Sequence, residues 1–210
     1  GLQRPDAGQI EVLGENMKGY ASKSEEVKTS INAINYKKAV VDDNYRQLTL
    51  QMKNRFSVIF RAYNDGAVYR FVTAFKDSIV VKNENATFNF NSDHSLFIPY
   101  VNDPHNNDVF ECSFENNYQH LKLSEINKDT LSFAPVLVEL PNGVKAAITE
   151  VDLEDYPGMF LQAKSSGFGL QGVFAPLPVA EKQGGHNNLQ SFVTKRANYI
   201  ARTNGRRNFP

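Results

Sequence analysis

The stretch that decides the fold is FSVIFRAYNDGAVYRFV, residues 56–72. Apolar and other side chains alternate in the first half of this stretch, and a second run rich in Val, Tyr and Phe returns after Asn64-Asp65-Gly66. An Asp-Gly pair between two such runs is a strong local signal for a β-hairpin, because glycine supplies the backbone conformation that a tight turn needs. We therefore expect two antiparallel strands here.

Further strands are expected on both sides of this hairpin. Residues 47–52 alternate apolar and polar side chains, and similar runs follow at 78–81, 87–90, 110–114, 131–140, 144–148, 160–163 and 172–174, with a second turn at 141–143. The chain also contains 15 Phe and 9 Tyr, residue types that favour strands. Strands at this density predict an all-β fold, a large antiparallel β-sandwich.

Residues 23–38 carry a conflicting signal. Ser22 and Glu25 have the spacing of a capping box, and three apolar residues, Val27, Ile31 and Ile34, follow at helical intervals. The β-branched residues around them favour extended structure instead. The pattern alone leaves both a helix and a strand open.

The composition fits one folded globular domain. Of the 210 residues, 41% are hydrophobic and 22% are charged, a balance typical of a chain that buries a core. The 23 Lys and Arg match the 23 Asp and Glu, so there is no basic excess of the kind that a nucleic-acid binder carries. The apolar runs are too short to span a bilayer, and residues 1–10 lack the apolar stretch of a signal peptide.

Several familiar motifs do not make a site. Residues 167–172 match G-x-G-x-x-G, but Pro176 and Pro178 follow where a nucleotide site needs a helix, so we expect a glycine-containing loop or bulge. Cys112 has no local nucleophile signature and is expected to pack inside a strand. The histidines lie in separate polar stretches without zinc-site spacing: His94, His105, His120 and His186.

An acidic segment is the strongest candidate for binding chemistry. Four carboxylates fall within six positions: Glu150, Asp152, Glu154 and Asp155. If the strand before them continued past Ile148, the first three would point to one face. Carboxylate oxygens suit Ca²⁺ better than zinc, but the spacing is not that of an EF-hand loop. From the residues alone, a metal site and a solvated strand end both remain open.

Four ordered segments resemble the N-terminal domain of glycoside hydrolase family 97. They are DNYRQLT (43–49), FRAYNDGAVYRF (60–71), ITEVDLEDYPGM (148–159) and RANYIARTNGRRNFP (196–210). The resemblance implies a β-sandwich of the galactose-mutarotase-like kind, which agrees with the alternating strand pattern. It also favours extended structure over a helix at residues 23–38.

The resemblance implies a role within a larger enzyme. Members of this family are exported bacterial α-glucosidases and α-galactosidases, so a periplasmic or exported location is expected. Their catalytic centre lies in a following (β/α)₈ barrel, with the oligosaccharide substrate beside the domain interface. The resemblance therefore implies that this chain alone is inactive and carries no catalytic residue.

The family also uses a Ca²⁺ ion near the reacting sugar. One ligand comes from the glutamate of the "ITE" motif, which corresponds to Glu150 here. The resemblance thus makes Glu150 a calcium ligand of the complete enzyme, while the isolated domain is expected to bind Ca²⁺ weakly, because affinity comes from several converging oxygens.

The resemblance also sets the expected boundaries. Residues 43–210 form the β-sandwich domain, and residues 1–42 are a poorly readable segment of the same domain. The expected early strands look truncated, and the chain stops where the family continues toward its barrel. The alternative is a free-standing carbohydrate-binding β-sandwich, although the absence of Trp disfavours it, because sugar-stacking platforms favour Trp.

Overall fold

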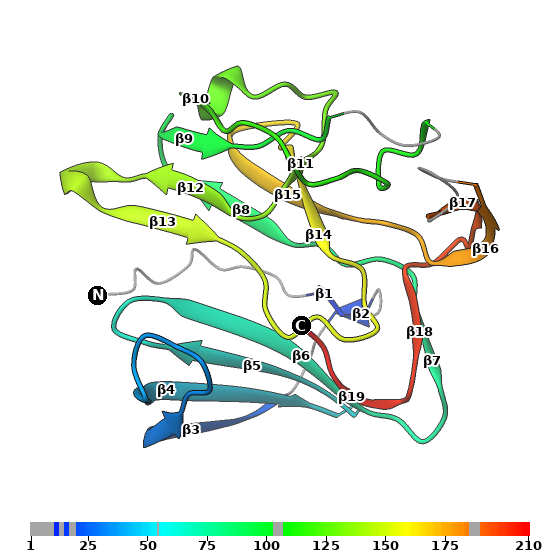
Figure 1. The fold of residues 1–210 in the computed structure, drawn as a ribbon. Coiled ribbons are helices and arrows are strands. Elements are labelled where there is room, and N and C mark those ends of the chain that lie inside the picture. The colour runs from blue at the N-terminus through cyan, green and yellow to red at the C-terminus, as the bar shows by residue number, and fades with distance from the viewer. Residues whose placement is uncertain (1–10, 13–14, 17–19, 54, 103–106, 185–189) are drawn as a thin grey trace. The chain divides into compact units, whose positions relative to one another are not determined.

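In a computed structural model, nearly all regular secondary structure of the described residues is β-strand (Figure 1). The structure describes residues 11–12, 15–16, 20–53, 55–102, 107–184 and 190–210. Every pairing between the strands of these residues is antiparallel. The predicted all-β, antiparallel fold class is confirmed.

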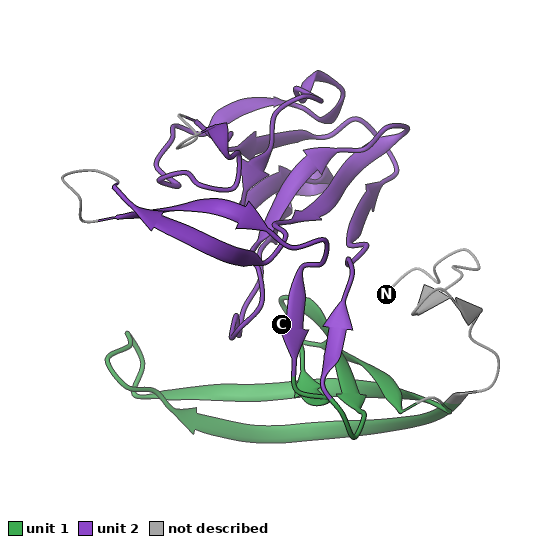
Figure 2. Cartoon of the chain, turned by 90° about the vertical axis from the view of Figure 1, so that its right-hand side faces the viewer, with its two compact units in different colours: residues 1–77, 204–209 green, residues 78–203, 210 purple. Residues whose placement is uncertain are grey.

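The chain forms two compact units (Figure 2). Unit 1 comprises residues 1–77 and 204–209, and unit 2 comprises residues 78–203 with residue 210. Each unit contains strands from both halves of the sequence, because a C-terminal strand returns to pair with an earlier one in each of them.

Unit 1 is a five-stranded sheet with the strand order β19-β6-β5-β4-β3. Its strands are β3 (Tyr20–Asn32), β4 (Val40–Met52), β5 (Phe56–Ala62), β6 (Ala67–Ala74) and β19 (Arg206–Asn208), and two short strands, β1 (Glu11–Val12) and β2 (Glu15–Asn16), pair with each other. The predicted hairpin is confirmed: β5 and β6 are joined by the Asn64–Gly66 turn, closed by the Tyr63 N–H donating to the Gly66 carbonyl at 2.8 Å.

The helical interpretation of residues 23–38 is wrong. All 13 residues of β3 pair with β4, from Tyr20 opposite Met52 to Asn32 opposite Val40. Val27 and Ile31 are four residues apart, a spacing that puts side chains on one face of a strand as well as of a helix. The long ladder of backbone hydrogen bonds therefore decides the conformation, as the family resemblance predicted.

Unit 2 contains two four-stranded sheets and two strand pairs. The first sheet has the order β10-β9-β12-β13 and the second β11-β14-β15-β8, while β16 pairs with β17 and β18 with β7. The bounds are β7 (Ile79–Val81), β8 (Thr87–Phe90), β9 (Ser95–Ile98), β10 (Gln119–Lys122), β11 (Ser132–Phe133), β12 (Val136–Glu139), β13 (Lys145–Ile148), β14 (Met159–Ala163), β15 (Phe168–Phe174), β16 (Pro178–Gln183), β17 (Ser191–Arg196) and β18 (Ala201–Thr203), with 3₁₀ turns at η2 (Leu123–Glu125) and η3 (Pro141–Gly143).

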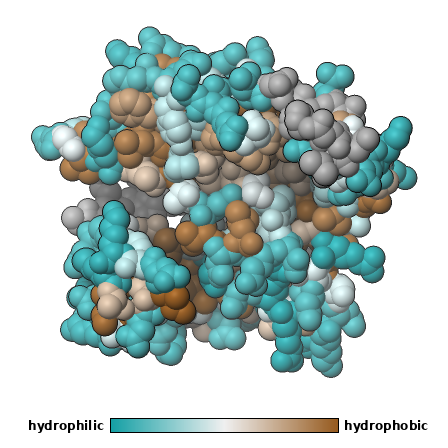
Figure 3. All heavy atoms as spheres, in the orientation of Figure 1, coloured by the Kyte–Doolittle hydropathy of each residue, from teal (hydrophilic) through white to brown (hydrophobic). Residues whose placement is uncertain are grey.

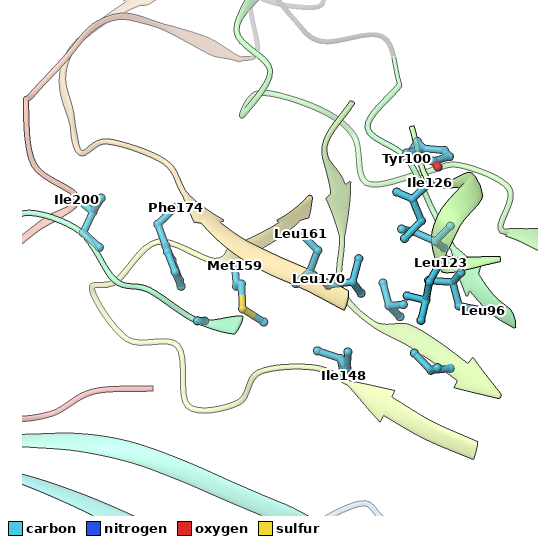
Figure 4. Close-up of a cluster of buried hydrophobic side chains, with 14 of the residues drawn as sticks. Leu96, Tyr100, Leu123, Ile126, Ile148, Met159, Leu161, Leu170, Phe174 and Ile200 are labelled. Carbon is cyan, nitrogen blue, oxygen red and sulfur yellow. The ribbon is translucent and has the colours of Figure 1, made fainter. Parts of the chain in front are cut away.

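The core of unit 2 is a continuous cluster of buried side chains contributed by both four-stranded sheets (Figure 4). Leu96, Leu161 and Leu170 are fully buried within it. Its members are Ala86, Leu96, Ile98, Tyr100, Leu123, Ile126, Val136, Val138, Ile148, Met159, Leu161, Leu170, Phe174, Ile200 and Ala201. This core fixes the start of β14, where the candidate site lies.

Two predicted strands differ from the structure. Residues 110–114 form no strand, and Cys112 lies there, partly exposed, so the strand placement predicted for it is wrong. The predicted strand 131–140 is two short strands, β11 and β12, separated at Pro135, whose missing N–H and fixed φ do not suit a ladder.

The glycine motif at 167–172 lies mostly inside strand β15, which pairs with β14 and β8 without a register shift, so it forms neither a nucleotide loop nor the predicted loop or bulge. A Cβ at Gly169 would clash with the carbonyl oxygen of Phe88 on the neighbouring strand β8. Glycine is therefore needed here for close backbone approach.

The surface is mixed in character. Polar side chains cover most of the face shown in Figure 3, with apolar patches between them. Within the described ranges, no helix is long and apolar enough to cross a membrane.

Candidate functional site

The candidate site is the loop 149–158, which joins β13 to β14 in unit 2. Strand β13 ends at Ile148, so the condition under which Glu150, Asp152 and Glu154 would share one strand face is not met. Asp152 and Asp155 have positive φ angles of 63° and 48°, a region that Asp tolerates better than most residues. The four carboxylates therefore do not lie along one strand.

Glu150 differs from the other acidic residues of the loop because its carboxylate is held by the backbone. The Met159 N–H donates to both carboxylate oxygens, at 2.7 and 2.9 Å. A Cβ on Gly158 would lie 3.2 Å from Glu150 Oε1, so glycine leaves room for the carboxylate. Glu150 is partly buried, whereas Asp152, Glu154 and Asp155 are exposed.

The environment of Glu150 disfavours its charged form. Burial raises the pKa of the Glu150 carboxyl above its ordinary value, and the Met159 N–H lowers it in part. A carboxylate that is partly desolvated and has no ion-pair partner is costly to keep charged. No ion pair is recorded for Glu150 among the residues that the structure describes.

A second carboxylate, Glu84, lies near this loop. The Tyr156 hydroxyl donates to Glu84 Oε2 at 2.9 Å. Burial raises the pKa of Glu84, the Tyr156 hydrogen bond lowers it in part, and the negative charge of Glu150 raises it further. Sequence reasoning missed Glu84, because it lies in a polar stretch 66 positions before Glu150 and has no local signature.

A cavity of about 660 Å³ adjoins the loop within unit 2. Glu150 and Tyr156 contribute to its wall, together with aromatic side chains, among them Phe110, Phe114 and Phe160. Arg196, also in the wall, forms an ion pair with Asp108 at 2.7 Å and donates to the Pro176 carbonyl at 2.8 Å. Glu150 thus borders a largely apolar hollow.

The described residues bring no three potential metal ligands together. His94 and His120 bond to other side chains, Ser92 and Glu139 respectively, while His105 and His186 lie outside the described residues. Glu150 fits a calcium site as one ligand of several, because a carboxylate has about four lone-pair positions and one backbone N–H leaves acceptor capacity unused. It does not make such a site alone.

The described residues of unit 2 form antiparallel β-sheets, and the Glu150 carboxylate is held beside a largely apolar hollow. The family model described as "Glycosyl-hydrolase 97 N-terminal" matches residues 2–202. The match includes residues 2–42, where the four motifs gave little guidance. The chain therefore belongs to glycoside hydrolase family 97, as its N-terminal domain.

Relatives agree with this assignment. The chain is 42% identical over 202 residues to a retaining alpha-galactosidase of Bacteroides thetaiotaomicron, an alignment that covers 95% of this chain and 30% of that protein. The chain thus spans less than a third of the length of this curated relative.

Solved structures share the fold. A glycoside hydrolase family 97 enzyme from Pseudoalteromonas sp. strain K8, in complex with acarbose, matches with a TM-score of 0.66 at 18% identity, covering 93% of this chain and 27% of that one. A beta-arabinopyranosidase matches with a TM-score of 0.70 at 18% identity, covering 90% and 30%.

Proposed function

We propose that this chain is the non-catalytic N-terminal β domain of a calcium-dependent α-glycosidase. In the complete protein it packs on a (β/α)₈ catalytic barrel and supplies Glu150 as one calcium ligand next to the active site. An α-galactoside is the first substrate class to test, because the relative that is 42% identical is a retaining alpha-galactosidase; an α-glucoside is the second.

The observation that carries the proposal is the fixed orientation of the Glu150 carboxylate beside the hollow. Its carboxylate is held in one orientation by the Met159 N–H at 2.7 and 2.9 Å, is partly buried, and lies beside a hollow. A ligand positioned in advance loses little conformational freedom when a cation binds, which favours binding. The bound ion would supply positive charge beside the reacting sugar.

In this proposal, residues of this chain orient the calcium ligand, and this domain takes no part in bond cleavage. The general acid and the nucleophile or base belong, in this proposal, to the part of the protein that the relatives carry beyond this alignment. Export to the periplasm or outside the cell belongs to the same proposal and is supported by the family resemblance. The free-standing binding module is less favoured, because the relatives carry this domain within longer chains.

The test uses the complete natural protein, stripped of metal with EDTA and titrated with Ca²⁺ while hydrolysis of nitrophenyl α-galactoside and α-glucoside is measured. Glu150→Gln removes the charge and keeps the shape, and Glu154→Gln is the matched control, because Glu154 is an exposed carboxylate of the same loop. We expect Glu150→Gln to raise the half-maximal Ca²⁺ concentration roughly tenfold or more, because Ca²⁺ affinity depends on the number and charge of the oxygen ligands. Unchanged calcium dependence in Glu150→Gln, or no hydrolysis of either substrate, contradicts the proposal.

A further inference from the structure

The segment that carries Glu84 is fixed against the strands that carry the candidate site. The Gly172 N–H of β15 donates to the Ala86 carbonyl at 2.7 Å. A Cβ on Gly172 would lie 3.0 Å from the Ala86 Cβ and 3.2 Å from the Met159 sulfur. Ala86 and Met159 therefore pack around the same glycine, and Met159 is the residue whose N–H holds Glu150.

Tyr156 joins this segment to the loop of Glu150. Its hydroxyl donates to Glu84 at 2.9 Å, and its ring packs edge-on against Phe174 of β15, with centroids 6.1 Å apart. The loop is thus tied down at two points: at Tyr156 by Glu84, and at Met159 by Glu150 itself.

We propose that Glu84 is a positioning residue for the calcium site of Glu150: through Tyr156 it fixes the loop, and its charge strengthens the negative field into which the cation binds. This inference rests on the proposed function of Glu150. Glu84 Oε2 accepts a hydrogen bond from the Tyr156 hydroxyl on the loop, and the role assigned to Glu84 is to position the loop, not to bind the ion.

The arrangement is unfavourable for the protein without the cation. Glu84 and Glu150 are both partly buried, and no ion pair is recorded for either within the described part of the chain. Burial and the neighbouring charge of Glu150 raise the pKa of Glu84. A structural hydrogen-bond acceptor for Tyr156 does not require a charge, since the oxygen of a neutral amide also accepts a hydrogen bond. A divalent cation beside Glu150 offsets the repulsion between the two carboxylates. The negative charge of Glu84 then contributes to the attraction that holds the cation.

The experiment compares four forms of the complete natural protein: wild type, Glu84→Gln, Glu150→Gln and Glu154→Gln. Each is stripped with EDTA, and its Ca²⁺ affinity is measured by isothermal titration calorimetry, which does not depend on activity. The melting temperature of each metal-free form is measured at the same pH. Glu84→Gln keeps an oxygen acceptor for the Tyr156 hydroxyl and removes only the charge.

We expect Glu84→Gln to weaken Ca²⁺ binding roughly tenfold, as the loss of outer-shell partners of metal ligands does, with no loss of melting temperature in EDTA. Glu154→Gln should bind Ca²⁺ like the wild type. If Glu150→Gln weakens binding and Glu84→Gln does not, Glu84 is only a structural acceptor and this inference is overturned, while the proposed function stands. If Glu150→Gln itself binds like the wild type, the proposed function fails first.

Discussion

The strands of both compact units have alternating sequences, yet the two units differ in how many side chains they bury in a core. Among the described residues of unit 1, the buried core cluster comprises Met52, Phe56 and Val58, with partly buried neighbours. In unit 2, fifteen buried side chains form one cluster. The comparison teaches that alternation produces a strand wherever a partner strand is available, while a core also requires a second layer of side chains.

The candidate site lies on the well-packed side of this comparison. Loop 149–158 follows Ile148 and precedes Met159, both members of the unit 2 core. A ligand that must hold one orientation is better supported by packed strands than by an exposed hairpin. The exposed β3–β4 hairpin offers no such support, because most of its side chains are exposed or only half-buried.

The largest difference in the free energy of unfolding is expected between two leucine-to-alanine substitutions, one in each unit. Leu161→Ala, at a fully buried position of unit 2, should lower the free energy of unfolding by about 3 kcal/mol, because it leaves a cavity. Leu48→Ala in unit 1, where the side chain is 39% exposed, should cost less than about 1 kcal/mol. Urea unfolding followed by pulsed hydrogen-exchange mass spectrometry reads peptides of each unit separately. Equal losses would show that unit 1 buries Leu48 in the complete protein.

Breaking one ion pair in each unit should also have unequal effects on the free energy of unfolding, but smaller ones. Asp108→Asn should cost about 2 kcal/mol, since it removes the charge from a largely buried hydrogen bond to Arg196. Glu25→Gln, which breaks the exposed pair with Lys23 in unit 1, should leave unfolding unchanged within error. The same unfolding measurement, repeated in 1 M salt, should leave the Asp108 effect nearly intact. A large Glu25 effect would contradict the comparison.

A pH series tests whether the pKa of the partly buried Glu84 carboxyl in unit 2 is raised in the calcium-free protein. The pKa of Glu84 is raised in the folded state, so the folded protein holds this proton more tightly than the unfolded chain does. The resulting stability is present below the ordinary glutamate pKa and is lost as the pH rises through the raised value. Wild type should therefore lose stability relative to Glu84→Gln as the pH rises across this window, measured by melting temperature. A constant difference between the two proteins would mean that Glu84 titrates normally.

The smallest effect is expected at the tip of the β3–β4 hairpin. Ile34 is 89% exposed, so Ile34→Ser should change the free energy of unfolding by less than about 0.5 kcal/mol. Calorimetry of the variant beside the wild type checks this. A drop of several degrees in melting temperature would break the comparison, because it would mean that the complete protein buries this tip.

The strands could be predicted from the sequence where alternation and turn chemistry agree, as in the hairpin around Asn64-Asp65-Gly66. Prediction failed at residues 110–114, where aromatic packing replaces strand pairing. Phe110 packs edge-on against Phe160, with ring centroids 5.3 Å apart. Phe114 packs in the same way against Phe133, with ring centroids 5.4 Å apart. Phe114 also has a φ of 54°, which a strand does not accommodate.

The candidate site was predictable in one residue and not in its surroundings. Glu150 stands in a motif that the sequence shows directly. The hydrogen bond of Tyr156 to Glu84 spans 72 positions, and neither residue has a local pattern that announces the other. Alternation ended the strand correctly at Ile148. It gave no sign that the Met159 N–H would donate to the Glu150 carboxylate nine positions earlier.

The most direct test of the central claim is an anomalous difference map from crystals of the complete natural protein grown with Ca²⁺. If Glu150 is a ligand, a calcium peak lies at about 2.3–2.6 Å from one of its carboxylate oxygens, with the Met159 N–H still donating to that carboxylate. A calcium ion bound elsewhere, with Glu150 outside coordination distance, would contradict the role assigned to this domain.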